Sequence, residues 1–172
     1  MENKSLAQVR ELFQDDRFAT LNGAQITEIG DHFAKCELEL EERHRNALGA
    51  VMGGATFTLA DFAFAVASNW EKPGTVSLSS NITYLGGVKG SRLIAEAHRV
   101  KDGRTTCYYQ VTVTDELGTQ VGSGQSGPYP AGSRSGQGTP QWAGSALWTP
   151  PPGRRGGREI DVPSPRSALL PS

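Results

Sequence analysis

Hydrophobic and polar positions follow two different periods in the first forty residues, one typical of a helix and one typical of a strand. In residues 5–14 the apolar side chains recur at the three- and four-residue spacing of an amphipathic helix, which Ser5 can cap. In residues 34–40 apolar and polar side chains alternate strictly, which predicts a strand with one face in water and turns Cys36 inward. The chain therefore opens with a helix and soon changes to strands.

The middle of the chain carries a nearly unbroken apolar run. Between Ala55 and Ala67, Asp61 is the only charged residue and no face is polar. A helix that is apolar on every side is a buried helix, and Gly53 and Gly54 stand where it would begin. An ionised carboxylate in such a helix is costly unless it has partners or a task. We therefore expect the function to lie here.

The residues on either side of this helix have the pattern of strands joined by turns. Pro73-Gly74 and Asp102-Gly103 are turn signals, and residues 86–90 form a glycine-rich loop. The predicted strands cover residues 24–30, 34–40, 75–85, 92–101 and 104–115, and a last strand begins at 119–121. A single buried helix needs a sheet to hide it, which predicts an α+β fold with a curved antiparallel sheet wrapped around one long central helix.

Composition divides the chain in two. Nine of the ten prolines lie after residue 121, where no lysine occurs and every basic residue is arginine. We predict a domain over residues 1–124 and a low-complexity tail rich in Gly, Pro, Ser and Arg over 125–172, which is disordered or aberrant. The expected last strand runs into Gly122-Ser123-Gly124, so we expect it to be cut short, with an exposed sheet edge and reduced stability.

Several classes of function are disfavoured. The domain has no basic stripe interleaved with aromatic residues, so no nucleic-acid partner is expected. It has neither a long apolar stretch nor a secretory leader, so we expect a cytoplasmic protein without a membrane span. Cys36 and Cys107 are isolated and are expected to be buried reduced thiols. No group of His, Cys or carboxylates has ligand spacing, so no metal is expected.

The start of the central helix can support chemistry on a carbonyl group. The first N–H groups of a helix have no partner within it and carry partial positive charge. Glycine at position 53 leaves its N–H open to an oxygen that becomes negative during a reaction, and Asp61 could accept a proton from water or attack directly. The alternative is that Gly53-Gly54 is only a tight packing point and that Asp61 only bonds a neighbouring backbone group.

The motif N-x-x-G-x-x-M-G-G-x-x-x-T-L-A-D, which starts at Asn46, resembles the hotdog-fold acyl-CoA thioesterases of the PaaI-like, phenylacetate-degradation type. The segments VSLSSNITYL and DGRTTCYYQVTVTDELGTQV resemble the strand after the central helix and the closing hairpin of those proteins. The resemblance covers roughly residues 5–121. It implies a hotdog fold and the hydrolysis of an acyl- or aryl-CoA thioester to free acid and coenzyme A.

The resemblance also implies roles for single residues. Asp61 would be the nucleophile or general base, and the Gly53 amide would polarise the thioester carbonyl beside Gly54. Asn46 would help to place substrate or water, and Ser77 would support the water. Each site would be shared across a homodimer, alone or as a dimer of dimers, with acyl-CoA as the ligand and no cofactor.

One residue departs from the family pattern. Met52 stands where many relatives have histidine, and methionine can neither donate a hydrogen bond nor hold a water. His44 is not at that position, and we interpret it as a solvated loop residue. Lys89 and Arg92 flank the glycine-rich loop and could bind the phosphates of coenzyme A, although scattered cations are more often a solvated surface.

Two other functions stay open. A non-catalytic acyl-CoA sensor fits the same fold, particularly with Met52 at the helix start. A hotdog hydratase or dehydratase is a weaker alternative, because that chemistry usually needs a histidine beside the carboxylate.

Overall fold

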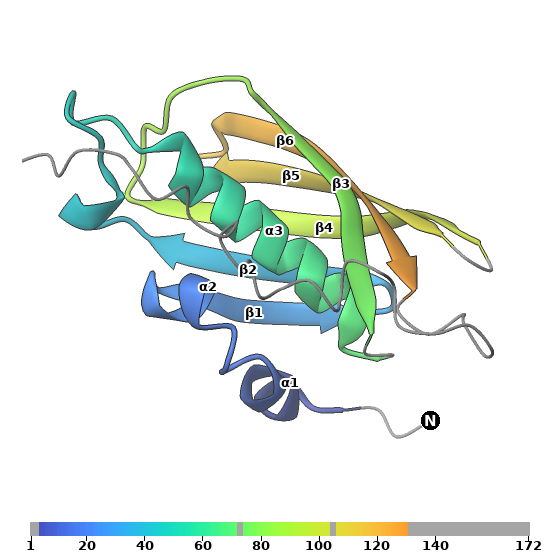
Figure 1. Ribbon diagram of the computed structural model, residues 1–172. Coiled ribbons are helices and arrows are strands. Elements are labelled where there is room, and N and C mark those ends of the chain that lie inside the picture. The colour runs from blue at the N-terminus through green and yellow to red at the C-terminus, as the bar shows by residue number, and fades with distance from the viewer. Residues whose placement is uncertain (1–3, 72–73, 104–105, 131–172) are drawn as a thin grey trace, which may run out of the picture. The chain divides into compact units, whose positions relative to one another are not determined.

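The computed structural model describes residues 4–71, 74–103 and 106–130, and it contains one antiparallel sheet with a long helix across one face (Figure 1). The sheet order is β1-β2-β4-β5-β6-β3. In chain order the elements are α1 (Leu6–Leu12), α2 (Arg17–Leu21), β1 (Ala24–Gly30), β2 (Phe33–Glu39), the 3-10 turn η1 (Glu42–His44), α3 (Gly53–Asn69), β3 (Thr75–Tyr84), β4 (Arg92–Asp102), β5 (Cys107–Asp115) and β6 (Gln120–Pro130).

The helix and the alternating strand predicted in the first forty residues are confirmed as α1 and β2. Ser5 caps α1 through a reciprocal hydrogen-bond pair with Gln8. In β2 the side chains of Ala34, Cys36 and Leu38 are buried, as strict alternation requires. Burial, with a smaller contribution from the charge of Glu37, raises the pKa of the Cys36 thiol. This cysteine is therefore a packing residue of the core.

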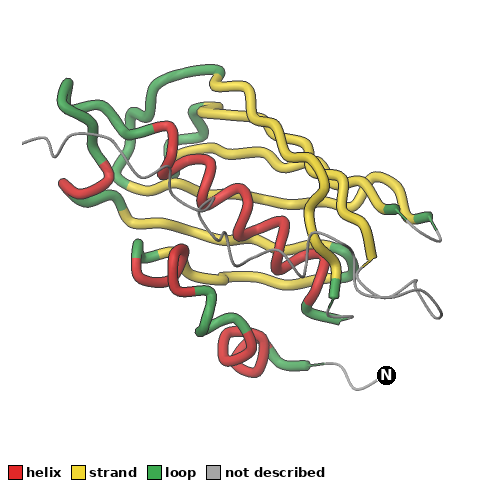
Figure 2. The backbone as a smooth tube through the Cα atoms, in the orientation of Figure 1, coloured by secondary structure: helices red, strands yellow, loops and turns green. Residues whose placement is uncertain are grey.

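Helix α3 lies diagonally across the concave face of the sheet and packs mainly on β4 and β2 (Figure 2). Leu59, Ala63 and Val66 of α3 are completely buried in the core. The expectation that the helix is buried on every side is wrong, because the sheet covers one face only and Gly54 and Asp61 are exposed. Among the described residues, no helix is both long and apolar enough to cross a membrane.

The last strand is longer than predicted. β6 runs to Pro130, beyond the boundary expected at residue 124, and pairs with β5 on one side and β3 on the other. Gly122 and Gly124 are buried, and a Cβ at Gly124 would come within 3.0 Å of the Asn81 carbonyl oxygen. Glycine thus fits a crowded strand here and does not end it. The expected loss of this strand is wrong, and the exposed edges of the sheet are β1 and β3.

Some predictions lie outside the described residues. Pro73 of the first turn, the start of the strand predicted at 104, and the tail from residue 131 onward are in this group.

Asp115, the last residue of β5, holds the glycine-rich loop at 86–90, and Glu116 beside it holds Ser91 and Arg92 at the start of β4. Asp115, whose residue is 1% exposed, accepts hydrogen bonds from the backbone N–H groups of Lys89 and Gly90 and from two N–H groups of its own turn. Burial acts to raise the pKa of Asp115, but these N–H groups outweigh it and lower the pKa to about 2. Hydrogen bonds from Ser91 likewise lower the pKa of Glu116 to about 2.

Acid is expected to destabilise the protein through this turn. Because both folded-state pKa values lie below the ordinary 3.8 and 4.5, their contribution to stability is complete above about pH 5 and is lost as the pH falls toward 2. Asp115→Asn should lower the melting temperature at pH 7 by about 5 °C or more and flatten its decline in acid, since an amide cannot accept all four bonds. Asp15→Asn, at an exposed site, is the matched control. Melting curves that fall in parallel for wild type and Asp115→Asn would contradict this account.

Candidate active site at the start of the central helix

The first turn of α3 presents unpaired backbone donors. Met52 is the N-cap in an extended conformation, and its side chain caps nothing. Its carbonyl oxygen accepts from Ala55 and Thr56. Within the described part of the chain, the N–H groups of Gly53 and Gly54 have no acceptor. Two donors at the positive end of a helix dipole are therefore free for an oxygen of a ligand.

Tyr84, at the end of β3, closes over this turn. Its hydroxyl donates a hydrogen bond to the Gly53 carbonyl oxygen at 3.0 Å. A Cβ at position 53 would lie 3.0 Å from Cζ and Oη of the same ring. Glycine at position 53 permits this close approach, which sequence reasoning did not predict.

Asn46 shapes the loop that leads into the helix. Its Oδ1 accepts from the N–H groups of Leu48 at 2.9 Å and Ala50 at 3.1 Å, and its own N–H donates to the Ala50 carbonyl. Gly49 takes the left-handed conformation, φ +76°, that this tight turn requires. The Nδ2 group of Asn46 has no partner among the residues that the structure describes, so it can still donate to a ligand.

The prediction that His44 is solvated is wrong. It is 3% exposed, its Nδ1 accepts from the Glu41 N–H at 2.9 Å, and its Nε2 lies 2.8 Å from the Asn22 carbonyl oxygen. The second contact requires a donor, so Nε2 carries the hydrogen in this arrangement. His44 also holds Met52 through its carbonyl oxygen, which accepts the Met52 N–H at 2.8 Å. This histidine builds the support of the helix start.

Asp61 lies two turns along α3, at the rim of a shallow recess between the helix and β3 and β6. Phe57 and the hydroxyls of Ser80 and Ser126 line the same recess. Desolvation by the surrounding atoms, and the charge of Asp16 to a smaller degree, raise the pKa of Asp61. A carboxylate with a raised pKa that stays open to solvent suits proton transfer.

Three hydroxyls form a chain beside this recess. Ser77 Oγ lies 2.7 Å from Ser80 Oγ, which lies 2.7 Å from the buried Ser126 Oγ. An irregularity in β3 between Ser77 and Ser79 brings positions 77 and 80 together. The predicted site residue Ser77 is thus linked to the Asp61 recess through Ser80, which sequence reasoning missed.

Gly53 and Asp61 of one chain cannot meet on one substrate atom. They are eight residues apart on a continuous helix, which is about 12 Å along its axis, and the Gly53 N–H points away from the helix body. A carbonyl bound at Gly53 is therefore beyond the reach of the same chain's Asp61.

The two predicted phosphate-binding cations differ in their surroundings. Lys89 has an exposed side chain on the loop that begins just after β3. Arg92 is paired twice, with Nη1 at 2.9 Å from Glu37 Oε2 and Nε at 2.8 Å from Glu39 Oε1. The Nε contact is an ion pair without hydrogen-bond geometry. These carboxylates already neutralise Arg92, so Lys89 is the better placed of the two for an anion.

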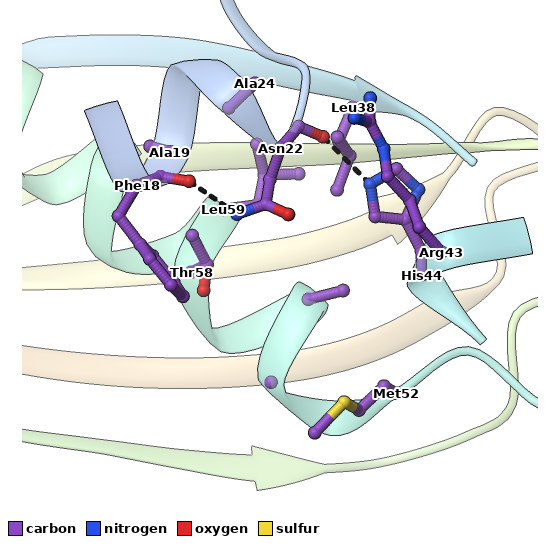
Figure 3. Close-up of a pocket in the computed structure, with 12 residues that line it drawn as sticks. Phe18, Ala19, Asn22, Ala24, Leu38, Arg43, His44, Met52, Thr58 and Leu59 are labelled. Carbon is purple, nitrogen blue, oxygen red and sulfur yellow. Dashed lines mark hydrogen bonds between the residues drawn. The ribbon is translucent and has the colours of Figure 1, made fainter. Parts of the chain in front are cut away.

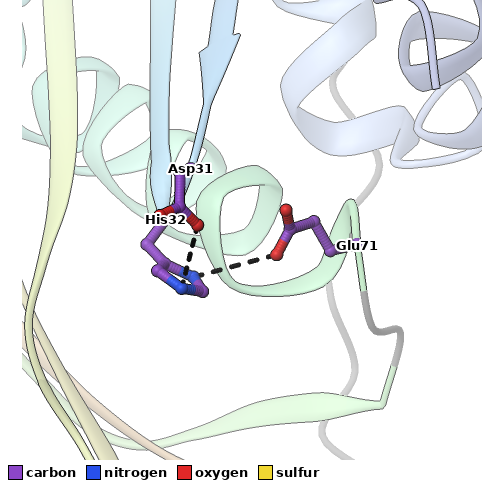
Figure 4. Close-up of side chains that lie close together, drawn as sticks. All are labelled: Asp31, His32 and Glu71. Atoms are coloured by element: carbon purple, nitrogen blue, oxygen red, sulfur yellow. Dashed lines mark ion pairs between the residues drawn. The ribbon is translucent and has the colours of Figure 1, made fainter. Parts of the chain in front are cut away.

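A second group of ionisable residues lies at the opposite end of α3 (Figure 4). His32 Nε2 is 3.0 Å from Asp31 Oδ1, and Nδ1 is 3.8 Å from Glu71 Oε2. His32 presents a different ring nitrogen to each carboxylate, and the three side chains offer ligand atoms that lie within 4.8 Å of one another. The cluster links the β1–β2 turn to the end of the helix.

Comparison with known proteins gives one consistent family. Residues 48–121 match the family profile described as the thioesterase superfamily. Mouse acyl-coenzyme A thioesterase 13 is 37% identical over 84 residues, 47% of this chain and 60% of that relative, so the match spans less than two thirds of its length. The phenylacetic acid degradation protein PaaI from Thermus thermophilus, solved as a point mutant, is 30% identical with a TM-score of 0.62, over 66% of this chain and 98% of that one.

One solved neighbour contains a ligand. The structure of a hypothetical thioesterase protein from Streptococcus pneumoniae with coenzyme A is 26% identical, with a TM-score of 0.64, over 73% of this chain and 98% of that one.

Proposed function

Because this chain belongs to the thioesterase superfamily, as a PaaI-like protein of hotdog fold, we propose that it hydrolyses acyl-coenzyme A to a free acid and coenzyme A. The observation that carries this proposal is the start of α3, where the N–H groups of Gly53 and Gly54 lack acceptors among the described residues. Coenzyme A is part of the substrate, and the reaction needs no cofactor.

The reaction begins when the thioester carbonyl oxygen accepts a hydrogen bond from the Gly53 N–H. Asp61 takes a proton from water while the hydroxide adds to the carbonyl carbon, and the negative charge on the oxygen is held by the helix start. The C–S bond then breaks, and the proton on Asp61 passes to the departing thiolate. If Asp61 instead attacks directly, an acid anhydride forms and water cleaves it to the same products.

The proposed site takes its two halves from two chains. The separation of about 12 Å between Gly53 and Asp61 along one helix requires a second protomer to bring its carboxylate to the carbonyl. β3 is an unpaired sheet edge with exposed Val76 and Leu78, as expected of a strand that pairs with its symmetry mate. We therefore propose a homodimer joined through β3, alone or within a dimer of dimers.

Substrate positioning uses residues around the helix start. Asn46 offers its Nδ2 donor to substrate or water, and Lys89 offers its ammonium group to a phosphate of coenzyme A. Met52 contributes only apolar contact.

The proposal is tested by thiol release from a panel of acyl-coenzyme A substrates with the full chain. Release of one thiol per free acid, catalytic in protein, supports a thioesterase. Tight binding of the panel without thiol release would overturn it and favour the acyl-CoA sensor. Hydration or dehydration of the acyl group with the thioester intact would favour the hotdog hydratase.

Ser80 is expected to act as a positioning residue for Ser77. Because its hydroxyl links Ser77 to Ser126, Ser80→Ala should lower kcat about tenfold and change KM little, which is the loss of one hydrogen bond. Ser79→Ala, on the neighbouring exposed position, is the control and should retain full kcat. Equal kcat values for the two variants would remove Ser80 from the site.

A further inference from the structure

A cavity of about 170 Å3 lies beside the start of α3, between that helix, α2, the first two strands and η1 (Figure 3). Gly54, Ala55, Thr58 and Leu59 of α3 form one wall. The other walls come from residues before the helix: Phe18, Ala19, Asn22, Ala24, Leu38, Arg43, His44 and Met52.

Most of the polar side chains in the walls already have partners. Asn22 Nδ2 donates to the Phe18 carbonyl oxygen at 2.6 Å, and both ring nitrogens of His44 are bonded. Arg43 pairs with Glu41 at 3.0 Å and donates to the Leu21 carbonyl oxygen. Because these polar groups already have hydrogen-bond partners, a polar ligand would add no new bond to them. An apolar ligand would bury the aliphatic surface of the walls and leave these bonds intact. The chemistry of the cavity therefore fits a hydrocarbon group.

The position of the cavity relates it to the helix start. Gly54, whose N–H lacks an acceptor among the described residues, is in its wall, and Met52 and Gly54 lie at the end nearest the Gly53 N–H. Because Gly53 is the neighbour of Met52 and Gly54 in the chain, a carbonyl oxygen bound at its N–H would lie beside this opening.

We propose that this cavity receives the apolar part of the acyl group and limits it to about six carbons, since a cavity of about 150 Å3 holds one benzene molecule. The inference rests on the proposed thioesterase function. It names a compact acyl group, a short chain or a single ring, as the substrate class. Phe18 sets the outer limit, and Ala55 sets the depth.

The test compares kcat/KM for acetyl-, hexanoyl-, octanoyl-, dodecanoyl- and phenylacetyl-coenzyme A. The wild type should prefer a six-carbon chain or a single ring. Comparison of hexanoyl- with phenylacetyl-coenzyme A tells which of these groups the cavity accepts. Ala55→Leu fills the cavity and should lower the hexanoyl-to-acetyl ratio about tenfold or more. Phe18→Ala opens it and should raise the octanoyl-to-hexanoyl ratio about tenfold.

The control is Leu21→Ala, because Phe18 and Leu21 are both 72% exposed on α2 and only Phe18 lines the cavity. It should leave every ratio unchanged. Since Phe18 is exposed, its variant keeps the test valid even where Ala55→Leu fails to fold. Ratios that stay constant in Phe18→Ala, with hydrolysis intact, would overturn the acyl pocket alone. Absence of hydrolysis for every substrate would overturn the proposed function and this inference with it.

Discussion

Replacing Asp61 with asparagine is expected to lower thioester turnover by about 10²–10⁴-fold, the usual contribution of a general base. The substitution keeps the shape of the side chain and removes its capacity to take a proton. Because Asp61 lies at the rim of a recess and is exposed on the single chain, the fold should tolerate the change. Thiol release and binding of the substrate are measured on the same preparation, and binding should persist.

Asp61→Asn should lower turnover without lowering the stability of the fold. A carboxyl group whose folded-state pKa is raised above its ordinary 3.8 disfavours folding when it is ionised. This penalty is fully present above the raised pKa and disappears as the pH falls below the ordinary value. Asp61→Asn should therefore melt at the same temperature as the wild type or higher at pH 7, and the difference should vanish in acid.

The pH dependence of wild-type turnover follows from the same shift. The base is active only when ionised, so kcat should fall with decreasing pH at a higher pH than an unperturbed aspartate would give. Full turnover in Asp61→Asn would contradict the assignment of Asp61 as the catalytic base, and a lower melting temperature at pH 7 would contradict the stability penalty of its raised pKa. Asp16→Asn is a useful companion, because removing its charge should shift the kcat profile toward lower pH.

The fold was largely predictable because its strands and helix are periodic and each has a clear buried face. Alternation in β2 fixed which side chains enter the core, and the apolar run fixed the central helix. The last strand is not predictable from its own residues, because glycine is more often found at strand ends and bulges than inside strands. A side chain at Gly124 would crowd the carbonyl oxygen of Asn81 on the neighbouring strand, and sequence alone does not show that neighbour.

The site was predictable in part for a related reason. Gly53 and Asp61 stand out locally, one by the absence of a side chain and the other by its charge in an apolar run. Tyr84, Ser80 and His44 act through partners 31, 46 and 22 residues away along the chain. Such contacts depend on strand register and loop closure, which no local pattern specifies.

Gly53→Pro is expected to lower kcat by about 10²–10³-fold, the loss that follows removal of one oxyanion donor. Gly53 is the first residue of α3, where proline is tolerated because its N–H has no helical acceptor, and Met52 before it has the extended conformation that proline requires. The substitution thus deletes the proposed donor and preserves the helix. Gly53→Ala is the matched control: it adds a Cβ against the same Tyr84 ring, which is 53% exposed and free to move, but keeps the N–H. Equal losses in the two variants would show that crowding, and not the lost donor, lowers activity.

Asp61→Asn and Gly53→Pro together test whether the site is shared between chains. In a mixed dimer one site combines the intact Gly53 of the first chain with the intact Asp61 of the second, while the other site carries both changes. Half of the dimers are mixed after random exchange and each has one working site of two, so activity should recover to about a quarter of the wild type. If each site were built within one chain, every site in the mixture would carry one defect and activity would stay at the level of the single variants. Recovery therefore requires that the carboxylate reach the partner's helix start.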